Sequence, residues 1–183
     1  MISDKKFREF VIGAAIISIT STAGFLIAPI EVRYLQSLTS NTTLIGLTYG
    51  LGSVLFAFLS LYLGRLSDRI GRNRFIIIGT SLGIIYPLLY ASVLNIYQYM
   101  GVKFLAVFAA VSVGPVFKAY LQDLLLHVKK QGQYMGTVYA VMAILGAGAQ
   151  LLGGFLSERY GFAMPYIVMS LFFALATVIS IFD

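Results

Sequence analysis

The sequence predicts an all-α integral membrane protein, folded as a bundle of six transmembrane helices. Hydrophobic residues make up 59% of the 183 residues, and the mean hydropathy is +0.89. Only 11% are charged, against about 25% in soluble domains, so too few polar side chains are present to cover a soluble surface. A helix needs about 20 apolar residues to cross the hydrocarbon core, and six such segments nearly exhaust the chain. They span residues 7–30, 43–63, 75–94, 97–121, 134–156 and 162–182 of a single domain, 1–183.

Each segment is bounded by polar or basic residues. The first follows a basic start and is longer than the apolar core of a signal peptide, about 7–15 residues, so we expect a retained helix. The second and third flank the charged stretch 64–75, and the fourth and fifth flank Lys129 and Lys130. The sixth follows Arg159 after a short break. Every proline lies inside a segment and is expected to kink it, namely Pro29, Pro87, Pro115 and Pro165.

The basic residues predict the orientation of the bundle. Most fall on one side: Lys5, Lys6, Arg8, Arg65, Arg69, Arg72, Arg74, Lys118, Lys129 and Lys130. Only Arg33, Lys103 and Arg159 fall on the other. Lysine and arginine accumulate on the cytoplasmic side, so we expect both termini in the cytoplasm and the protein in the plasma membrane. The net charge of +6 is then a topology signal, and no nucleic-acid partner is expected because the chain has no soluble basic face.

Composition also limits the chemistry. There is no cysteine and one histidine, so thiol catalysis and cysteine-ligated zinc are excluded. No Ser/His/Asp set, metal-ligand spacing or phosphate-binding loop is present, so we expect no enzyme activity, no metal and no cofactor. The aromatic anchors at the membrane interfaces must be tyrosines, since tryptophan is absent. Those near the segment ends are Tyr34, Tyr97, Tyr99, Tyr134 and Tyr160.

The stretch "GRLSDRIGRNRF", residues 64–75, carries the most specific motif. A topology signal explains its arginines but not Asp68, nor the bracketing Gly64 and Gly71, because acidic residues contribute little to orientation. The stretch resembles the turn between helices two and three of the major facilitator superfamily of secondary transporters, Gly-x-Leu-Ala/Ser-Asp-Arg-x-Gly-Arg-Lys/Arg. Seven positions match in place, namely Gly64, Leu66, Ser67, Asp68, Arg69, Gly71 and Arg72, whereas Asn73 departs from the pattern.

The resemblance extends along the chain. Lys103 and Pro115 have the spacing of the Arg and Pro in the family's fourth helix, and Asp123 matches the acidic residue that closes that helix. Gly153 and Gly154 match the end of the fifth-helix motif Gly-Pro-x-x-Gly-Gly, but Ala149 and Gln150 replace its Gly-Pro, which weakens a case for antiport. Pro29 with Tyr34 resembles the outer end of helix one. The whole chain resembles the amino-terminal six-helix half of a family with twelve helices.

The resemblance implies a conformational latch at the cytoplasmic turn. Gly64 would let a helix of the opposite bundle approach, and Asp68 would meet that helix's positive amino-terminal end. Arg69 and Arg72 would hold Asp68 and Asp123 in an ion network next to Gly71. The alternative is that Asp68 only pairs with its neighbours and shortens the turn.

Three further residues are candidates for a substrate or proton cavity. Lys103 lies about 8 Å into its segment at about 1.5 Å per residue, where it either binds an anion or tunes a proton carrier, or else extends to the interface. Glu31 is a candidate partner of Lys103 or Arg33, and the alternative is a solvated helix end. Gln150 lies among small residues and, if buried, needs a hydrogen-bond partner. Gly153 and Gly154 are expected to serve helix packing, and Pro29 and Pro115 to kink their helices.

The resemblance implies secondary active transport of a small solute by alternating access, with protons as the family's usual coupling ion. A six-helix bundle leaves its cavity face open, so we expect a second six-helix bundle as partner, either a second copy or a separately encoded half. The alternative is an incomplete or half-size transporter that acts only as a binding or structural membrane subunit. The lipid bilayer and a small-molecule solute are the other partners expected.

Overall fold

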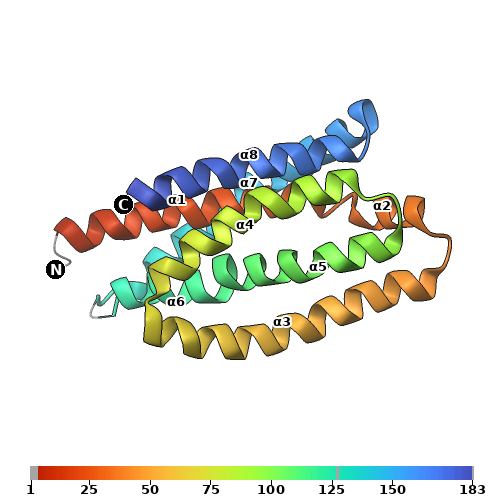
Figure 1. Cartoon of the computed structure of the whole chain (residues 1–183). Helices are drawn as coiled ribbons and strands as arrows, with labels where there is room; N and C mark the ends of the chain where they lie inside the picture. Colours follow the sequence, from red (N-terminus) through yellow and green to blue (C-terminus); the bar gives the residue numbers. More distant parts are fainter. Residues whose placement is uncertain (1–3, 127, 183) are drawn as a thin grey trace.

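A computed structural model describes residues 4–126 and 128–182, and these are helical almost throughout (Figure 1). Six spans are long and apolar enough to cross a membrane, which confirms the predicted fold class. The helices are α1 (Asp4–Ile27), α2 (Glu31–Leu38), α3 (Thr42–Ile70), α4 (Arg72–Ser92), α5 (Ile96–Val111), α6 (Phe117–Leu124), α7 (Gln131–Tyr160) and α8 (Ala163–Phe182). A π-helical turn, η1 (Ser112–Val116), joins α5 to α6, so these three elements form the fourth span.

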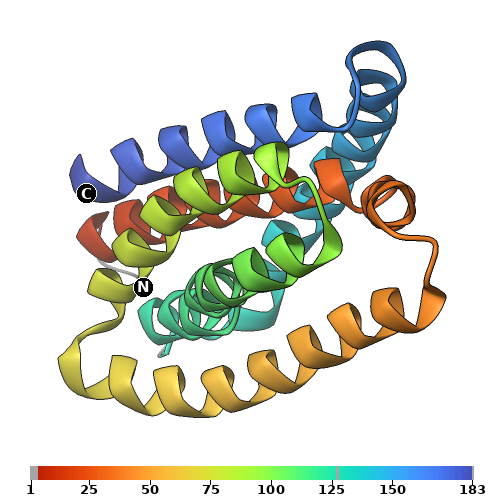
Figure 2. The ribbon, with the colours of Figure 1, turned by 45° about the vertical axis from the view of Figure 1, so that its right-hand side comes forward.

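Helix α1 lies at the centre of the bundle, packed between α7 and α8. Helix α4 packs on α8 and α5, and α3 packs on α5 on the far side of the bundle from α8 (Figure 2). The α3–α4 turn, the start of α1 and the ends of α6 and α8 lie at one end of the bundle, which we call the turn end. Helix α2 lies at the opposite end, which we call the α2 end (Figure 1).

The turns follow from local sequence chemistry. Asn41 and Asn95 precede α3 and α5, and each side chain accepts backbone N–H hydrogen bonds from the first turn of its helix. Gly71 and Gly161 end α3 and α7 with φ angles of 107° and 83°, which only glycine adopts without strain. The tight α3–α4 turn therefore depends on Gly71.

The helix bounds differ from the predicted segments in two ways. Helices α3 and α7 continue past the apolar runs, because charged side chains at their ends reach water without interrupting the backbone hydrogen bonds. The first span instead ends at Ile27, and Pro29 lies in the turn before α2. The prediction that Pro29 kinks a helix is therefore wrong, as it is for Pro165 in the first turn of α8, where proline costs no hydrogen bond. Pro87 lies inside α4, and Pro115 lies in η1.

Glycines bring α7 against α1 in the half of the bundle nearer α2. A Cβ atom on Gly153 would overlap the backbone carbonyl oxygen of Leu26, and one on Gly146 would press on the Phe25 ring. Nothing lies within 4 Å of the corresponding position on Gly154. Of the two glycines expected to serve packing, Gly153 is the one in contact with a neighbouring helix of this bundle.

Candidate functional site

A partly buried ion pair joins two elements at the α2 end of the bundle. The Nζ atom of Lys103 lies 3.1 Å from Oε1 of Glu31, and both side chains are about one-fifth exposed, 19% and 23%. The hydroxyl of Tyr99 donates a hydrogen bond of 2.7 Å to the same carboxylate oxygen. Of the two cations that the sequence offered to Glu31, Lys103 is its partner, and Arg33 is exposed.

Local structure places the two charges next to each other. The turn that contains Pro29 redirects the chain, so that Glu31 opens α2 beside the bundle axis. Lys103 lies on α5 one helical turn after Tyr99, so both project from the same face. Gly52 on α3 leaves space for the lysine, because a Cβ atom there would come within 2.9 Å of Lys103 Cε.

Aromatic rings surround this pair. The Nζ atom of Lys103 lies 5.4 Å from the ring centre of Tyr49 and 5.8 Å from that of Tyr99, close enough for cation–π attraction. The rings of Tyr90 and Tyr99 stack with their centres 4.2 Å apart. The hydroxyl of Tyr34 donates a 2.6 Å hydrogen bond to the backbone carbonyl of Tyr90. Burial raises the pKa of the Tyr34 phenol above its ordinary value of 10.0, so this donor keeps its proton.

Two cavities meet at Lys103. One, of about 200 Å³, lies between α1, α4, α5 and α8 and is lined by Glu31, Lys103 and several tyrosines. The other, of about 390 Å³, lies between α3 and α5 and also reaches Lys103. Within the described part of the chain, the buried hydroxyls of Tyr90 and Tyr166, both in the wall of the smaller cavity, have no hydrogen-bond partner. This site can therefore offer a cation and an anion to a small molecule, with the phenols of Tyr90 and Tyr166 in the wall beside them.

A second charged network lies at the turn end. Arg72 contacts Asp68 at 2.9 Å and Asp123 at 3.1 Å, so it bridges the α3–α4 turn and the end of α6. Both carboxylates are more than half exposed. Arg69 is exposed and forms no ion pair with any described residue, so Arg72 alone bridges the two carboxylates. Nothing lies within 4 Å of the Cβ position of Gly64.

The sequence profile of the Major Facilitator Superfamily matches residues 11–183, which include both charged networks. The chain belongs to the Major Facilitator Superfamily. Members of this family are transporters and not enzymes, in agreement with the expectation of no enzyme activity. No group of three or more His, Cys, Asp or Glu residues that could hold a metal ion occurs among the described residues.

Three curated relatives are similar to this chain. The uncharacterized MFS-type transporter MJ1560 of Methanocaldococcus jannaschii is 31% identical over 173 residues, which are 93% of this chain and 44% of the relative. Multidrug resistance protein 2 of Bacillus subtilis is 26% identical over 86% of this chain and 39% of its own length. The chain therefore spans less than half the length of these two relatives. The uncharacterized MFS-type transporter YitZ of Bacillus subtilis is 28% identical over 84% of this chain and 93% of its own length.

The remaining predicted site residues of this superfamily member are spread along the bundle. Gln150 is exposed on α7 and does not line either cavity at Lys103. Pro115 lies in η1, between Lys103 of α5 and Asp123 of α6 along the fourth span. Pro29 is close in sequence to Glu31 but belongs to the turn before it.

Sequence reasoning missed the tyrosines that surround the ion pair. Tyr34 and Tyr99 were expected at the membrane interface, but they are 7% and 1% exposed, so that interpretation is wrong for both. It fits Tyr97 and Tyr160, which are largely exposed. The spacing of Tyr86 and Tyr90 by four residues was an available signal, because it places two phenols on one face of α4.

Proposed function

We propose that this chain is one six-helix half of a secondary transporter that moves a small, lipophilic organic solute by alternating access. The observation that carries the proposal is the Glu31–Lys103 pair, held between α2 and α5 at the meeting of two cavities. Ionisable residues within membrane spans are costly, and they usually face a cavity and take part in transport. The family membership over residues 11–183 supports the same function.

The chemistry of the cavity supports this solute class. Its walls are mainly aromatic and aliphatic, and its charges are one lysine and one carboxylate that neutralise each other. The buried hydroxyls of Tyr90 and Tyr166 would orient a polar group on the solute. One relative of this chain carries the name Multidrug resistance protein 2, which is consistent with a lipophilic solute. We also propose that transport is coupled to protons, the usual coupling ion of this family.

A second six-helix bundle is part of the proposal. Helices α3 and α7 bury the smallest shares of their residues, whereas α1 buries the largest. Gln150 is exposed on α7 at mid-helix, where contact with lipid tails would leave its amide unsatisfied. A facing bundle or a water-filled cavity would satisfy it. The second bundle would be another copy of this chain or a separate half.

The turn end supplies the element that could alternate. A recess of about 500 Å³ lies beside Asp68, Arg72 and Asp123, and Gly64 leaves open space nearby. A helix of the second bundle could approach there and place its positive amino-terminal end against Asp68. Separation of the bundles at this end would open the cavity toward the side on which both termini lie, which we propose is the cytoplasm. Closing and separating the bundles at the turn end would shift the protein between two states, which is the basis of alternating access.

The test is dye efflux from bacterial cells that lack their own multidrug pumps and express the full chain. We expect energised cells to export ethidium faster than cells with an empty vector, and a protonophore to abolish the difference. Lys103→Met is expected to remove the efflux. Lys118→Met is the matched control, because Lys118 lies in the same span but contacts Tyr139 instead of the ion pair.

Native mass spectrometry in nanodiscs tests the second bundle. We expect a particle of twice the 20.0 kDa mass of the chain, or one with a second six-helix protein. Ethidium export at the empty-vector rate by correctly inserted protein would contradict the proposed transport. Export unchanged by Lys103→Met would contradict the proposed site. A chain that exports dye as a monomer would contradict the need for a second six-helix bundle.

A further inference from the structure

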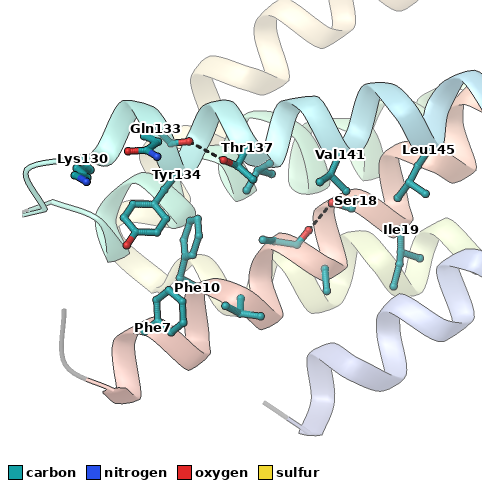
Figure 3. Close-up of a pocket in the computed structure, with 14 residues that line it drawn as sticks. Phe7, Phe10, Ser18, Ile19, Lys130, Gln133, Tyr134, Thr137, Val141 and Leu145 are labelled. Atoms are coloured by element: carbon teal, nitrogen blue, oxygen red, sulfur yellow. Dashed lines mark hydrogen bonds between the residues drawn. The ribbon is translucent and has the colours of Figure 1, made fainter. Parts of the chain in front are cut away.

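A long apolar groove lies between α1 and α7 at the turn end (Figure 3), and no residue of either charged network lines it. Its volume is about 640 Å³. Phe7, Phe10 and Val11 of α1 form one wall, and Val141 and Leu145 of α7 form the other. The polar side chains that reach it are concentrated toward one end, where Lys130, Gln133 and Tyr134 lie.

The groove has the length of one membrane leaflet. On α1 it runs from Phe7 to Ile19, about 18 Å at 1.5 Å per residue, and half of the hydrocarbon core is about 15 Å. It stops at Leu145, because from Gly146 onward α7 packs directly on α1. A transmembrane helix of a partner crosses both leaflets, whereas this groove is open over only one. Its dimensions match an acyl chain that enters from the turn end.

The mouth of the groove is positively charged. Lys130 lies in its lining, and Lys129 is exposed beside it. The first two turns of α1, at the same end of the bundle, carry Lys5, Lys6 and Arg8, of which Lys5 contacts Glu9 at 4.0 Å. Helix α7 begins at Gln131 without a side-chain cap, so the positive end of its dipole also lies at the mouth.

We propose that this groove binds one anionic phospholipid from the leaflet at the turn end, with an acyl chain between α1 and α7 and the phosphate on Lys130. Basic pockets between transmembrane helices are general sites for anionic headgroups, and apolar walls below such a pocket accept the chain. An uncharged occupant would gain nothing from the lysine, whereas an anionic headgroup is attracted to it. The site is separate from the Glu31–Lys103 cavities, so its occupancy does not depend on the solute that is transported.

Quenching of an introduced tryptophan by brominated phospholipids tests the site. The chain has no tryptophan, so a single Phe7→Trp substitution, at a half-exposed groove residue, reports on the groove alone. The full chain is reconstituted in phosphatidylcholine vesicles with rising fractions of acyl-brominated phosphatidylglycerol or acyl-brominated phosphatidylcholine. We expect half-maximal quenching at about one-fifth of the lipid fraction with brominated phosphatidylglycerol that brominated phosphatidylcholine needs. The reason is that each lysine near the surface contributes about that factor to the affinity for an anionic lipid.

Two matched controls separate the groove from general lipid contact. Ile181→Trp places the reporter on the exposed face of α8 at the same end of the bundle, and we expect both lipids to quench it equally. With Phe7→Trp as reporter, Lys130→Gln is expected to abolish the preference. Arg65→Gln makes the same charge change on α3, which does not line the groove, and the preference is expected to remain.

Three results would overturn the proposal. Equal quenching of the Phe7→Trp reporter by both lipids would mean that the groove holds no selective site. A preference that survives Lys130→Gln would place the anionic headgroup elsewhere. Absence of quenching by either lipid would mean that a protein segment, such as the second bundle, fills the groove.

Discussion

The two ends of the bundle carry similar charges in different surroundings. At the α2 end, Glu31 and Lys103 are about one-fifth exposed, and Tyr99 donates a hydrogen bond to the carboxylate. At the turn end, Asp68 and Asp123 are more than half exposed, at 59% and 56%, and share one arginine, Arg72. The first pair is shielded by aromatic rings, whereas water and ions reach both carboxylates of the second, although the Arg72 side chain itself is only 22% exposed.

This difference in surroundings separates two uses of an ion pair. A shielded pair is costly to break, because each charge left alone is poorly solvated. An exposed pair contributes little, since water screens it and solvates either partner after separation. The α2 end is therefore suited to hold a fixed charge arrangement around a cavity. The turn end is suited to open and close with a small change in free energy.

Removal of the carboxylate at the α2 end is expected to have the largest effect. Glu31→Gln leaves the Lys103 charge among tyrosines without a counter-charge, and we expect the free energy of unfolding to fall by about 3 kcal/mol. The double variant Glu31→Gln with Lys103→Met should regain most of this loss. Unfolding by sodium dodecyl sulfate in mixed micelles, followed by circular dichroism, measures both. Equal losses in the single and double variants would show that the pairing itself matters little.

Close packing near the α2 end gives the second prediction. Gly153→Ala forces a Cβ atom against the Leu26 carbonyl oxygen, and such overpacking costs about 2 kcal/mol of unfolding free energy. Gly154→Ala is the matched variant, where the space is open and alanine favours the helix by about 1 kcal/mol. In the same detergent titration, we therefore expect Gly153→Ala to be less stable than the wild type and Gly154→Ala to be more stable. Similar values for both would contradict the close approach of α7 to α1.

The hydrogen bond to Glu31 gives a smaller effect. Tyr99→Phe keeps the ring but removes the donor to a charged oxygen, and we expect a loss of about 1.5 kcal/mol in unfolding free energy. Tyr97→Phe removes a hydroxyl from a largely exposed tyrosine on the same helix and should have no measurable effect. If both variants match the wild type, the Tyr99 hydroxyl is not part of the site.

The turn end is expected to show the smallest effect on stability. Arg72→Gln removes both contacts to the exposed carboxylates, and we expect the loss to stay below about 1 kcal/mol and to disappear in about 1 M salt, where the screening length is about 3 Å. Arg69→Gln has the same charge change without the contacts and should match the wild type at low salt. Unfolding measured at two salt concentrations checks both. A large, salt-independent loss in Arg72→Gln would show that the two ends do not differ.

Much of this fold follows directly from the sequence. Apolar length alone predicts the six spans, because the hydrocarbon thickness sets the number of residues per crossing. The Asp68–Arg72 contact is also local, because only the tight turn at Gly71 separates the end of α3 from the start of α4. Helix α2 was not predicted, because Ile27 and Ile30 continue the apolar run and hide the break before Glu31.

The site at the α2 end was only partly predictable. Glu31 and Lys103 could each be identified as unusual charges, but the choice between Lys103 and Arg33 depends on how α2 and α5 pack together. The aromatic surroundings depend on packing even more, because a tyrosine near a span end has the same sequence pattern whether it meets lipid or the bundle interior. Gly52 had no signal of its own, since its importance comes from a lysine on another helix.

The π-helical turn η1 lies between the two halves of the fourth span, α5 and α6. Lys103 precedes it and Asp123 follows it, so one continuous span carries a residue of each charged network. A π-helical turn holds one residue more than an α-helical turn, so it takes up an extra residue within that turn. The faces of α5 and α6 therefore stay nearly in phase across η1. The fourth span can thus keep Lys103 on Glu31 and Asp123 on Arg72 even though its backbone hydrogen-bond pattern changes between them.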